Sequence, residues 1–195
     1  CFQLLLDHQC QEEIDKDFLN LALIETDKID RRIRQLLSLV RPSPPNFAWC
    51  NVNQILDSTI NMLRNVISAR NIEFIDCRSD SLADIYADKE QLEQVFFNIG
   101  LNALEAMENG GKLTIETLVK TNGENITEDG SVVVKISDTG KGISKIELEN
   151  IFEPFYTKKS SGTGLGLTIV RNIVKEHNGH IYVESHEGQG TSFTI

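Results

Sequence analysis

Residues 94–107, QVFFNIGLNALEAM, combine an apolar helix with a stripe of side-chain amides. Gln94, Asn98 and Asn102 recur every four residues, so they share one face of the helix that we expect over residues 89–107. Asparagine is a mediocre helix former because its side chain competes for backbone hydrogen bonds, so two asparagines in mid-helix need a reason. An amide oxygen is a neutral ligand suited to Mg²⁺, which shares its shell with phosphates. A polar edge facing solvent is the alternative interpretation.

A second motif, DTGKGI at residues 138–143, directly follows a strand expected over residues 132–137. A carboxylate followed by two glycines predicts a tight turn where a flat ligand can approach the backbone. The ionised carboxylate of Asp138 only accepts hydrogen bonds, so it can bind an exocyclic amine. By itself this motif is weak, because such turns also occur as plain turns and calcium loops.

A third motif, GTGLGL at residues 162–167, opens a helix expected over residues 168–177. Its three glycines leave backbone N–H groups free to face an anion at the positive end of the helix dipole. The spacing is that of neither a dinucleotide-binding fingerprint nor a P-loop. The preceding residues 151–161, IFEPFYTKKSS, have the composition of a hinged lid with cations for phosphates. An exposed loop in which Lys158 and Lys159 are merely solvated is the alternative.

Around these motifs, the pattern predicts helices interleaved with mostly antiparallel strands. We expect a helix over residues 52–68, short strands at Ile72–Cys77 and 84–87, strands at 112–120 and 132–137 joined by a polar turn at 121–130, and closing strands at 181–184 and 191–195. This order predicts an α/β fold, a two-layer sandwich in which helices cover one face of a mixed sheet.

The first 40 residues contain no glycine and carry an apolar stripe typical of a coiled coil or a helix bundle. The members of the stripe recur at steps of three and four: Leu19, Ala22, Thr26, Ile29, Ile33, Leu36 and Val40. The sequence RPSPP at residues 41–45 ends this helix and separates it from the rest of the chain. We therefore divide the chain into a helical segment at 1–45 and a mixed domain at 46–195. A helix that packs on its own domain's core is the alternative.

Composition restricts the possible functions. The 195 residues include Lys+Arg 19 and Asp+Glu 29, a formal net charge of −10, which opposes binding to nucleic acid or an anionic membrane. No apolar run approaches the roughly 20 residues that a membrane-spanning helix needs. The 4 cysteines are scattered without zinc-site spacing, and we interpret them as reduced thiols of a cytoplasmic protein. Disulfides in a secreted protein are the alternative.

Taken in order, the amide-striped helix, the DTGKG turn, FEPF and GTGLGL resemble the N, G1, F and G2 boxes of sensor histidine kinases. The wider family with this ATP-binding domain includes DNA gyrase and the Hsp90 chaperones. The resemblance covers residues 47–195, and NALEAM at 102–107 is most similar to the nitrogen-regulation type. It implies a Bergerat-type ATP-binding fold over 46–195, and a dimerisation and phosphoacceptor hairpin, with its first arm truncated, at 1–45.

The resemblance also implies roles for individual residues. Asn102 would coordinate Mg²⁺, with Asn98 contributing to the same site. Asp138 would accept a hydrogen bond from the adenine amine, Ile143 would pack against the adenine base, and Thr191 would help to hold the base. Lys159 and the backbone amides from Gly162 to Leu167 would hold the phosphates, and Phe152 and Phe155 would anchor the lid. The residues implied in the nucleotide site also include Gly140, Gly142, Phe155, Thr157, Gly162, Thr163, Gly164, Leu165, Gly166 and Leu167. Glu105 departs from the family pattern, because many members place a basic residue there.

The implied function is that of the ATP-binding catalytic part of a sensor histidine kinase, with ATP and Mg²⁺. It would pass the γ-phosphoryl group to a histidine, from which an Asp of a response-regulator receiver domain takes it. His8 lacks the acceptor context, so we expect the phosphoacceptor upstream of Cys1, in a longer protein that forms a homodimer through the hairpin. We expect neither nucleic acid nor direct membrane contact for this chain, although the parent could be membrane-anchored.

Two other functions fit the same motifs: a hydrolysing ATPase clamp, and a nucleotide-binding scaffold without transferase activity. ATPases of the wider family place a water-activating Glu at the position of Asn98, so the amide argues against the clamp.

Overall fold

The structure is a computed structural model that describes residues 44–120, 131–159 and 162–195. The chain divides into two units, Cys1–Ser43 and Pro44–Ile195, and the described residues belong to the second. The apolar stripe of the predicted hairpin and the predicted polar turn at 121–130 lie outside the described residues. Among the helices that the structure describes, none is long and apolar enough to cross a bilayer.

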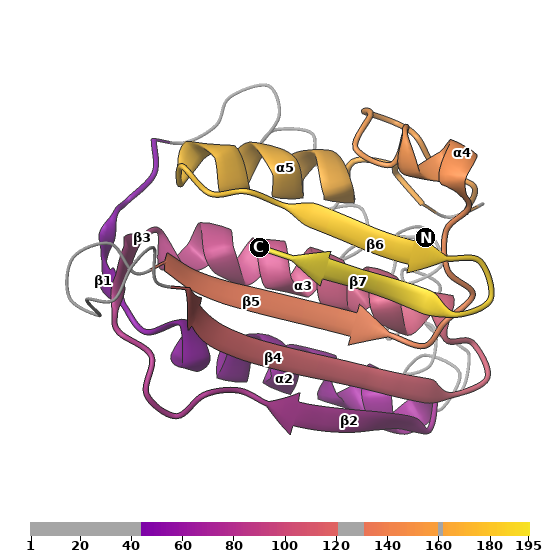
Figure 1. Cartoon of the computed structure of the whole chain (residues 1–195), viewed down its shortest axis with the longest axis horizontal. Helices are drawn as coiled ribbons and strands as arrows, with labels where there is room; N and C mark the ends of the chain where they lie inside the picture. Colours follow the sequence, from indigo (N-terminus) through magenta and orange to yellow (C-terminus); the bar gives the residue numbers. More distant parts are fainter. Residues whose placement is uncertain (1–43, 121–130, 160–161) are drawn as a thin grey trace, which may run out of the picture. The chain divides into compact units, whose positions relative to one another are not determined.

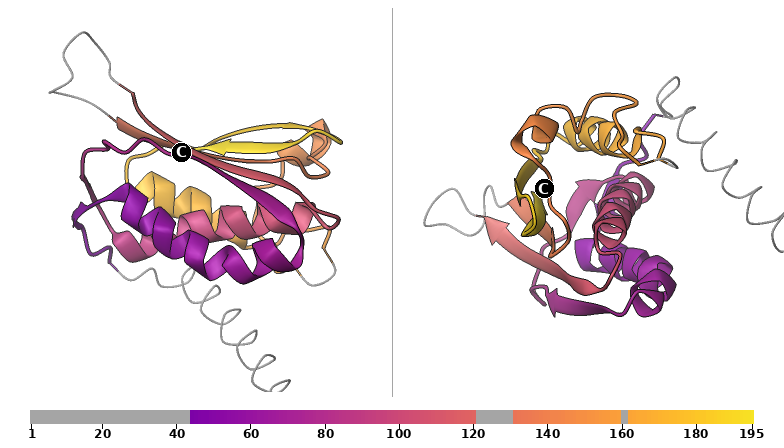
Figure 2. Two further views of the ribbon diagram at one scale, coloured as in Figure 1. Left: turned by 90° about the horizontal axis from the view of Figure 1, so that it is seen from below. Right: turned by 90° about the vertical axis from the view of Figure 1, so that its right-hand side faces the viewer.

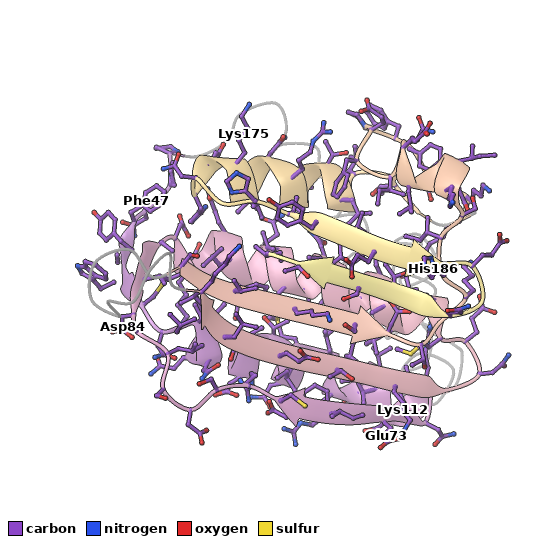
Figure 3. All side chains as sticks on the ribbon, in the orientation of Figure 1. Phe47, Glu73, Asp84, Lys112, Lys175 and His186 are labelled. Atoms are coloured by element: carbon purple, nitrogen blue, oxygen red, sulfur yellow. The ribbon has the colours of Figure 1, made fainter. Side chains whose placement is uncertain are left out.

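One layer of the domain is a five-stranded mixed sheet of order β2-β4-β5-β7-β6 (Figure 1). The strands are β2 (Ile72–Cys77), β4 (Gly111–Lys120), β5 (Ser131–Asp138), β6 (Tyr182–His186) and β7 (Gly190–Thr194). Strand β2 pairs in parallel with β4, and the other neighbours are antiparallel. In the parallel pair Glu73 lies opposite Lys112, and their side chains form an ion pair at 3.0 Å at one end of these strands (Figure 3).

The other layer consists of α2 (Val52–Ala69), α3 (Lys89–Ala106) and α5 (Gly166–Glu176), which lie on one face of the sheet (Figure 2). Helix α3 contacts both α2 and α5, so it forms the centre of this layer. Its residues Val95, Phe96 and Ile99 are buried, and they form the core with alternate residues of β4 and β5. The predicted two-layer α/β sandwich is thereby confirmed.

The predicted helix over 89–107 begins at Lys89, directly after its N-cap residue Asp88. Asp88 precedes α3, and its side chain accepts a hydrogen bond from the backbone N–H of Gln91 at 3.0 Å. The backbone N–H of Asn46 donates to the same carboxylate at 2.7 Å. The helix ends at Ala106, one residue before the predicted end, and the chain turns at Gly110 and Gly111 as expected.

Strand β6 ends at His186, two residues later than expected, and three other local features also differ from the sequence-based expectation. Strand β1 (Ala48–Cys50) was not predicted, and it pairs with β3 (Ile85–Ala87) in a separate two-stranded sheet. Three residues are too few to show an alternating pattern. A short helix, α4 (Lys145–Leu148), also went unpredicted, although Ser144 and Glu147 form a capping box. Helix α5 begins at Gly166, two residues earlier than expected.

Candidate nucleotide site

Helix α3 carries the predicted amides, and Asn98 is not on a solvent-facing edge. Its side chain is buried, with the residue 8% exposed, and its Nδ2 has no hydrogen-bond partner among the described residues. Gly166, the first residue of α5, faces it: a methyl group on Gly166 would stand 3.8 Å from Asn98 Oδ1. The start of α5, whose first-turn N–H groups have no partner within the helix, therefore lies directly against Asn98.

One turn further along α3, Asn102 meets the lid. The ammonium of Lys159 donates a hydrogen bond to Asn102 Oδ1 at 3.2 Å and forms an ion pair with Glu105. Lys159 was predicted to bind phosphate, whereas its contact with Glu105 was not predicted. The spacing of 102 and 105 places both side chains on the same helix face, a signal that the sequence did contain.

Asp138 is the last residue of β5 and is only 7% exposed. Burial raises the pKa of its carboxyl group, while hydrogen bonds from the backbone N–H groups of Gly140 and Thr191 act in the opposite direction. The bond from Gly140 measures 2.8 Å. The turn then packs on the end of α3, because Lys141 N–H donates to the carbonyl of Ala106 at 3.2 Å. A side chain on Gly140 would stand 2.7 Å from Ala106 Cβ, so this position has no room for one.

The residues predicted to surround the base are joined by a serine that the sequence did not single out. Ser185 Oγ accepts from the backbone N–H of Ile143 at 2.8 Å and donates to the carbonyl of Gly190 at 2.8 Å. It also lies 2.9 Å from Thr191 Oγ1. Thr191 is buried and lies opposite Asp138 in the β5–β7 register. Asp138, Ile143 and Thr191 therefore share one end of the sheet.

The turn at residues 138–143 also packs closely against the hairpin of β6 and β7. Gly142 has φ +68, and a Cβ there would lie 2.1 Å from the carbonyl oxygen of His186, the residue labelled at the end of β6 in Figure 3. Only glycine tolerates both this backbone conformation and this approach. The position of the Asp138 turn is thereby fixed from two sides, by α3 and by the hairpin.

The glycine-rich segment is held against the preceding lid by backbone contact. Gly164 has φ +67, and a Cβ there would lie 2.4 Å from the carbonyl carbon of Phe155, which itself has φ 65. Phe155 is 67% exposed, so its side chain does not anchor the lid as predicted, and backbone packing positions the segment instead. Leu165 is buried, and its N–H donates to Thr163 Oγ1 at 3.4 Å.

Local hydrogen bonds shape the lid before this segment. Thr157 Oγ1 accepts from Lys159 N–H at 3.1 Å, and Gly162 N–H donates to the carbonyl of Lys159 at 3.1 Å. The carbonyl of Phe152 accepts from Thr168 Oγ1 at 3.1 Å, which fastens the start of the lid to α5. Leu167 is half-buried in the first turn of α5.

A second ion pair connects the lid with α4. Lys158 Nζ lies 2.8 Å from Glu147 Oε1, and the hydrogen bonds from Lys158 and then Ser144 lower the pKa of Glu147 to about 2. Both lysines of the predicted lid therefore face carboxylates, Lys158 on α4 and Lys159 on α3.

The predicted residues thus form two groups that meet at the C-terminal half of α3. One group contains Asn98, Asn102, Lys159 and Gly166. The other contains Asp138, Ile143 and Thr191 at the end of the sheet, with the turn between 138 and 143 fastened to Ala106. This arrangement places the amides of Asn98 and Asn102, the start of α5 and the Lys159–Glu105 pair on one side, and the buried carboxylate of Asp138 on the other.

Comparisons with known proteins identify relatives of this chain. Sensor histidine kinase ZraS of Salmonella typhi is 37% identical over 171 residues, which is 88% of this chain and 35% of the relative. The chain therefore spans about a third of that protein. The catalytic domain of histidine kinase ThkA is 31% identical, with a TM-score of 0.64 over 76% of this chain and 93% of that one. ThkA in complex with response regulator protein TrrA has a TM-score of 0.70 at 24% identity over 99% of this chain and 54% of that one, a likeness of fold alone.

The family model described as histidine kinase-, DNA gyrase B-, and HSP90-like ATPase matches residues 87–195, which is more than half of the chain. That range contains the amide stripe, the Asp138 turn and the glycine-rich segment. On this match the chain belongs to the family of histidine kinase-, DNA gyrase B- and HSP90-like ATPases.

Proposed function

We propose that this chain is the catalytic part of a sensor histidine kinase, which binds Mg-ATP and delivers the γ-phosphoryl group to a histidine. That histidine would lie on the first arm of a dimerisation hairpin to which residues 1–45 contribute, and an Asp of a response-regulator receiver domain would then take the phosphoryl group. The observation that carries the proposal is the convergence of Asn98, Asn102, Lys159 and the start of α5.

The residues present fit a magnesium-bound nucleotide. Asn98 has a buried amide nitrogen without a partner among the described residues, and Asn102 Oδ1 already faces a cation, the ammonium of Lys159. Amide oxygens are ligands that Mg²⁺ accepts while it keeps waters and phosphates in its shell. When bound, Mg²⁺ would neutralise charge on the β- and γ-phosphates. Asn102 would hold the ion, with Asn98 beside it.

The remaining residues would orient the nucleotide. Lys159 and the N–H groups of residues 162–167 would hold phosphate oxygens, because the N–H groups of a first helical turn and the helix dipole favour anions at a helix start. The N–H groups of Gly162 and Leu165 would first leave the carbonyl of Lys159 and Thr163 Oγ1. Asp138 would accept from the adenine amine in its ionised form, with Thr191 beside it. Phosphoryl transfer depends mostly on such positioning and charge neutralisation, and an imidazole can attack without a strong base from this domain.

The first experiment is nucleotide binding. The 195-residue chain should bind a fluorescent ATP analogue in the presence of Mg²⁺, and Asn102→Ala should weaken binding at least tenfold, about 1.4 kcal/mol. Asn61→Ala removes an exposed amide on α2 and should leave the affinity unchanged. Failure of the wild-type chain to bind would refute the proposal.

The second experiment is transfer. The parent protein with its complete hairpin should incorporate acid-labile phosphate from radiolabelled ATP, whereas the 195-residue chain should not. Steady release of inorganic phosphate by the chain, lost in Asn102→Ala and without phosphohistidine on the parent, would instead favour a hydrolysing ATPase.

A further inference from the structure

Glu105 lies beside the predicted magnesium ligand, on the same face of α3 and one turn after Asn102. Its side chain is 36% exposed, so it is partly sheltered from solvent. The ammonium of Lys159 bonds to both residues, at 3.2 Å from Asn102 Oδ1 and in an ion pair with Glu105 Oε2. An amide oxygen and a carboxylate oxygen therefore converge on one cation.

This pair of oxygens is a donor set for a divalent ion. Mg²⁺ in nucleotide sites is commonly held by one or two carboxylates together with substrate phosphates and waters. The carboxylate of Glu105 is a stronger ligand for a double charge than a second amide, because it is itself charged. A carboxylate in this position would also repel phosphate oxygens unless a cation stood between them.

Glu105 neutralises the charge of Lys159 in this structure. While its charge is paired with Glu105, the lid offers the triphosphate no free charge from this lysine. Phosphate oxygens are strong acceptors for an ammonium, so Lys159 can exchange Glu105 for phosphate without loss of a charge-assisted hydrogen bond. That exchange leaves the carboxylate of Glu105 without its cation and Asn102 Oδ1 without its hydrogen-bond donor.

We propose that Glu105 joins Asn102 as a ligand of the Mg²⁺ that arrives with the nucleotide, while Lys159 moves from these two oxygens to the phosphates. The inference rests on the proposed nucleotide site and adds a carboxylate ligand to it. In this structure Lys159 bonds to the two oxygens that the metal would bind. Glu105 thereby makes the affinity for nucleotide depend on whether Mg²⁺ is bound.

The test measures the dissociation constant of a fluorescent ATP analogue with EDTA and with saturating Mg²⁺ for each variant. The ratio of the two constants is the magnesium enhancement. In Glu105→Gln this ratio should fall at least tenfold, while the affinity in EDTA stays equal or increases because Lys159 is released. Glu108→Gln, which removes an exposed carboxylate three residues away, should keep the wild-type ratio.

Glu105→Asp keeps a carboxylate and should retain more of the enhancement than Glu105→Gln, and circular dichroism melts confirm that each variant is folded. If Glu105→Gln tightens binding equally with and without Mg²⁺, Glu105 only restrains Lys159 and the metal-ligand proposal is wrong. Equal weakening under both conditions would assign Glu105 a structural role and also overturn it. If the wild-type chain binds no nucleotide under either condition, the proposed function itself fails, and this inference fails with it.

Discussion

The close approach of Gly164 to Phe155 makes a quantitative prediction about the glycine-rich segment. In Gly164→Ala, the new Cβ would lie 2.4 Å from the carbonyl carbon and 2.7 Å from the Cα of Phe155, both backbone atoms. Backbone cannot rotate away as a flexible side chain can, so the segment or the lid must move. Gly188, in the turn between β6 and β7, has a similar φ of +78, but a Cβ there meets nothing within 4 Å. It is therefore the matched control.

The two substitutions separate the cost of backbone conformation from the cost of the clash. A non-glycine residue with positive φ costs about 1–2 kcal/mol, which is the expected destabilisation in Gly188→Ala. Gly164→Ala bears this cost and, in addition, about 1–3 kcal/mol for overpacking. If the segment relieves the clash by separating from the lid, part of the additional cost appears as lost nucleotide affinity, at about 1.4 kcal/mol per tenfold.

The assays are urea unfolding followed by circular dichroism, and titration with a fluorescent ATP analogue in Mg²⁺. We expect Gly188→Ala to bind nucleotide like the wild type, and Gly164→Ala to bind at least tenfold more weakly or to unfold at a clearly lower urea concentration than Gly188→Ala. Equal midpoints together with equal affinities in the two variants would show that the contact between Gly164 and Phe155 does not constrain the site.

Three further predictions concern buried and paired carboxylates. Burial raises the pKa of Asp138 above its ordinary value of 3.8, so its charge costs stability at neutral pH, and this cost disappears as pH falls through the raised pKa towards 3.8. Asp138→Asn should therefore be at least as stable as the wild type at pH 7 in urea titrations. The gain in the free energy of unfolding is about 1.4 kcal/mol for every pH unit between the raised pKa and the ordinary one, and it should vanish near pH 4. The same variant should lose nucleotide affinity. Asp88→Ala removes the cap of α3 and the acceptor of Asn46 N–H, so it should lower the free energy of unfolding by about 1–2 kcal/mol, measured by urea unfolding; no change would contradict the capping role. Lys158 lowers the pKa of Glu147 to about 2, so the ion pair stabilises the folded state fully above pH 4.5. This stabilisation is lost as pH falls towards 2. Because the pair is near the surface, Glu147→Gln should change the free energy of unfolding at neutral pH by less than about 1 kcal/mol, measured in the same way.

The regular elements followed from local patterns wherever those patterns were long. The apolar periodicity of α2 and α3 and the bounds of β2 were predicted almost to the residue, because helix and strand periods are set within a few neighbouring positions. Strand β1 escaped prediction because three residues carry no period and because its partner β3 lies far along the chain. Helix α5 began early because a glycine that we assigned to the loop adopts the first helical position.

The sequence by itself determined which chemical groups this protein has: the amide stripe of α3, the carboxylate after β5 and the glycines before α5, each defined within six to fourteen consecutive residues. Only the tertiary structure decided which of them meet. Lys159 and Glu105 are 54 positions apart, and Ser185 joins Ile143 and Thr191 from a neighbouring strand. No local pattern encodes such contacts, because they depend on how α3, α5 and the sheet pack into two layers, and packing is a property of the whole buried core.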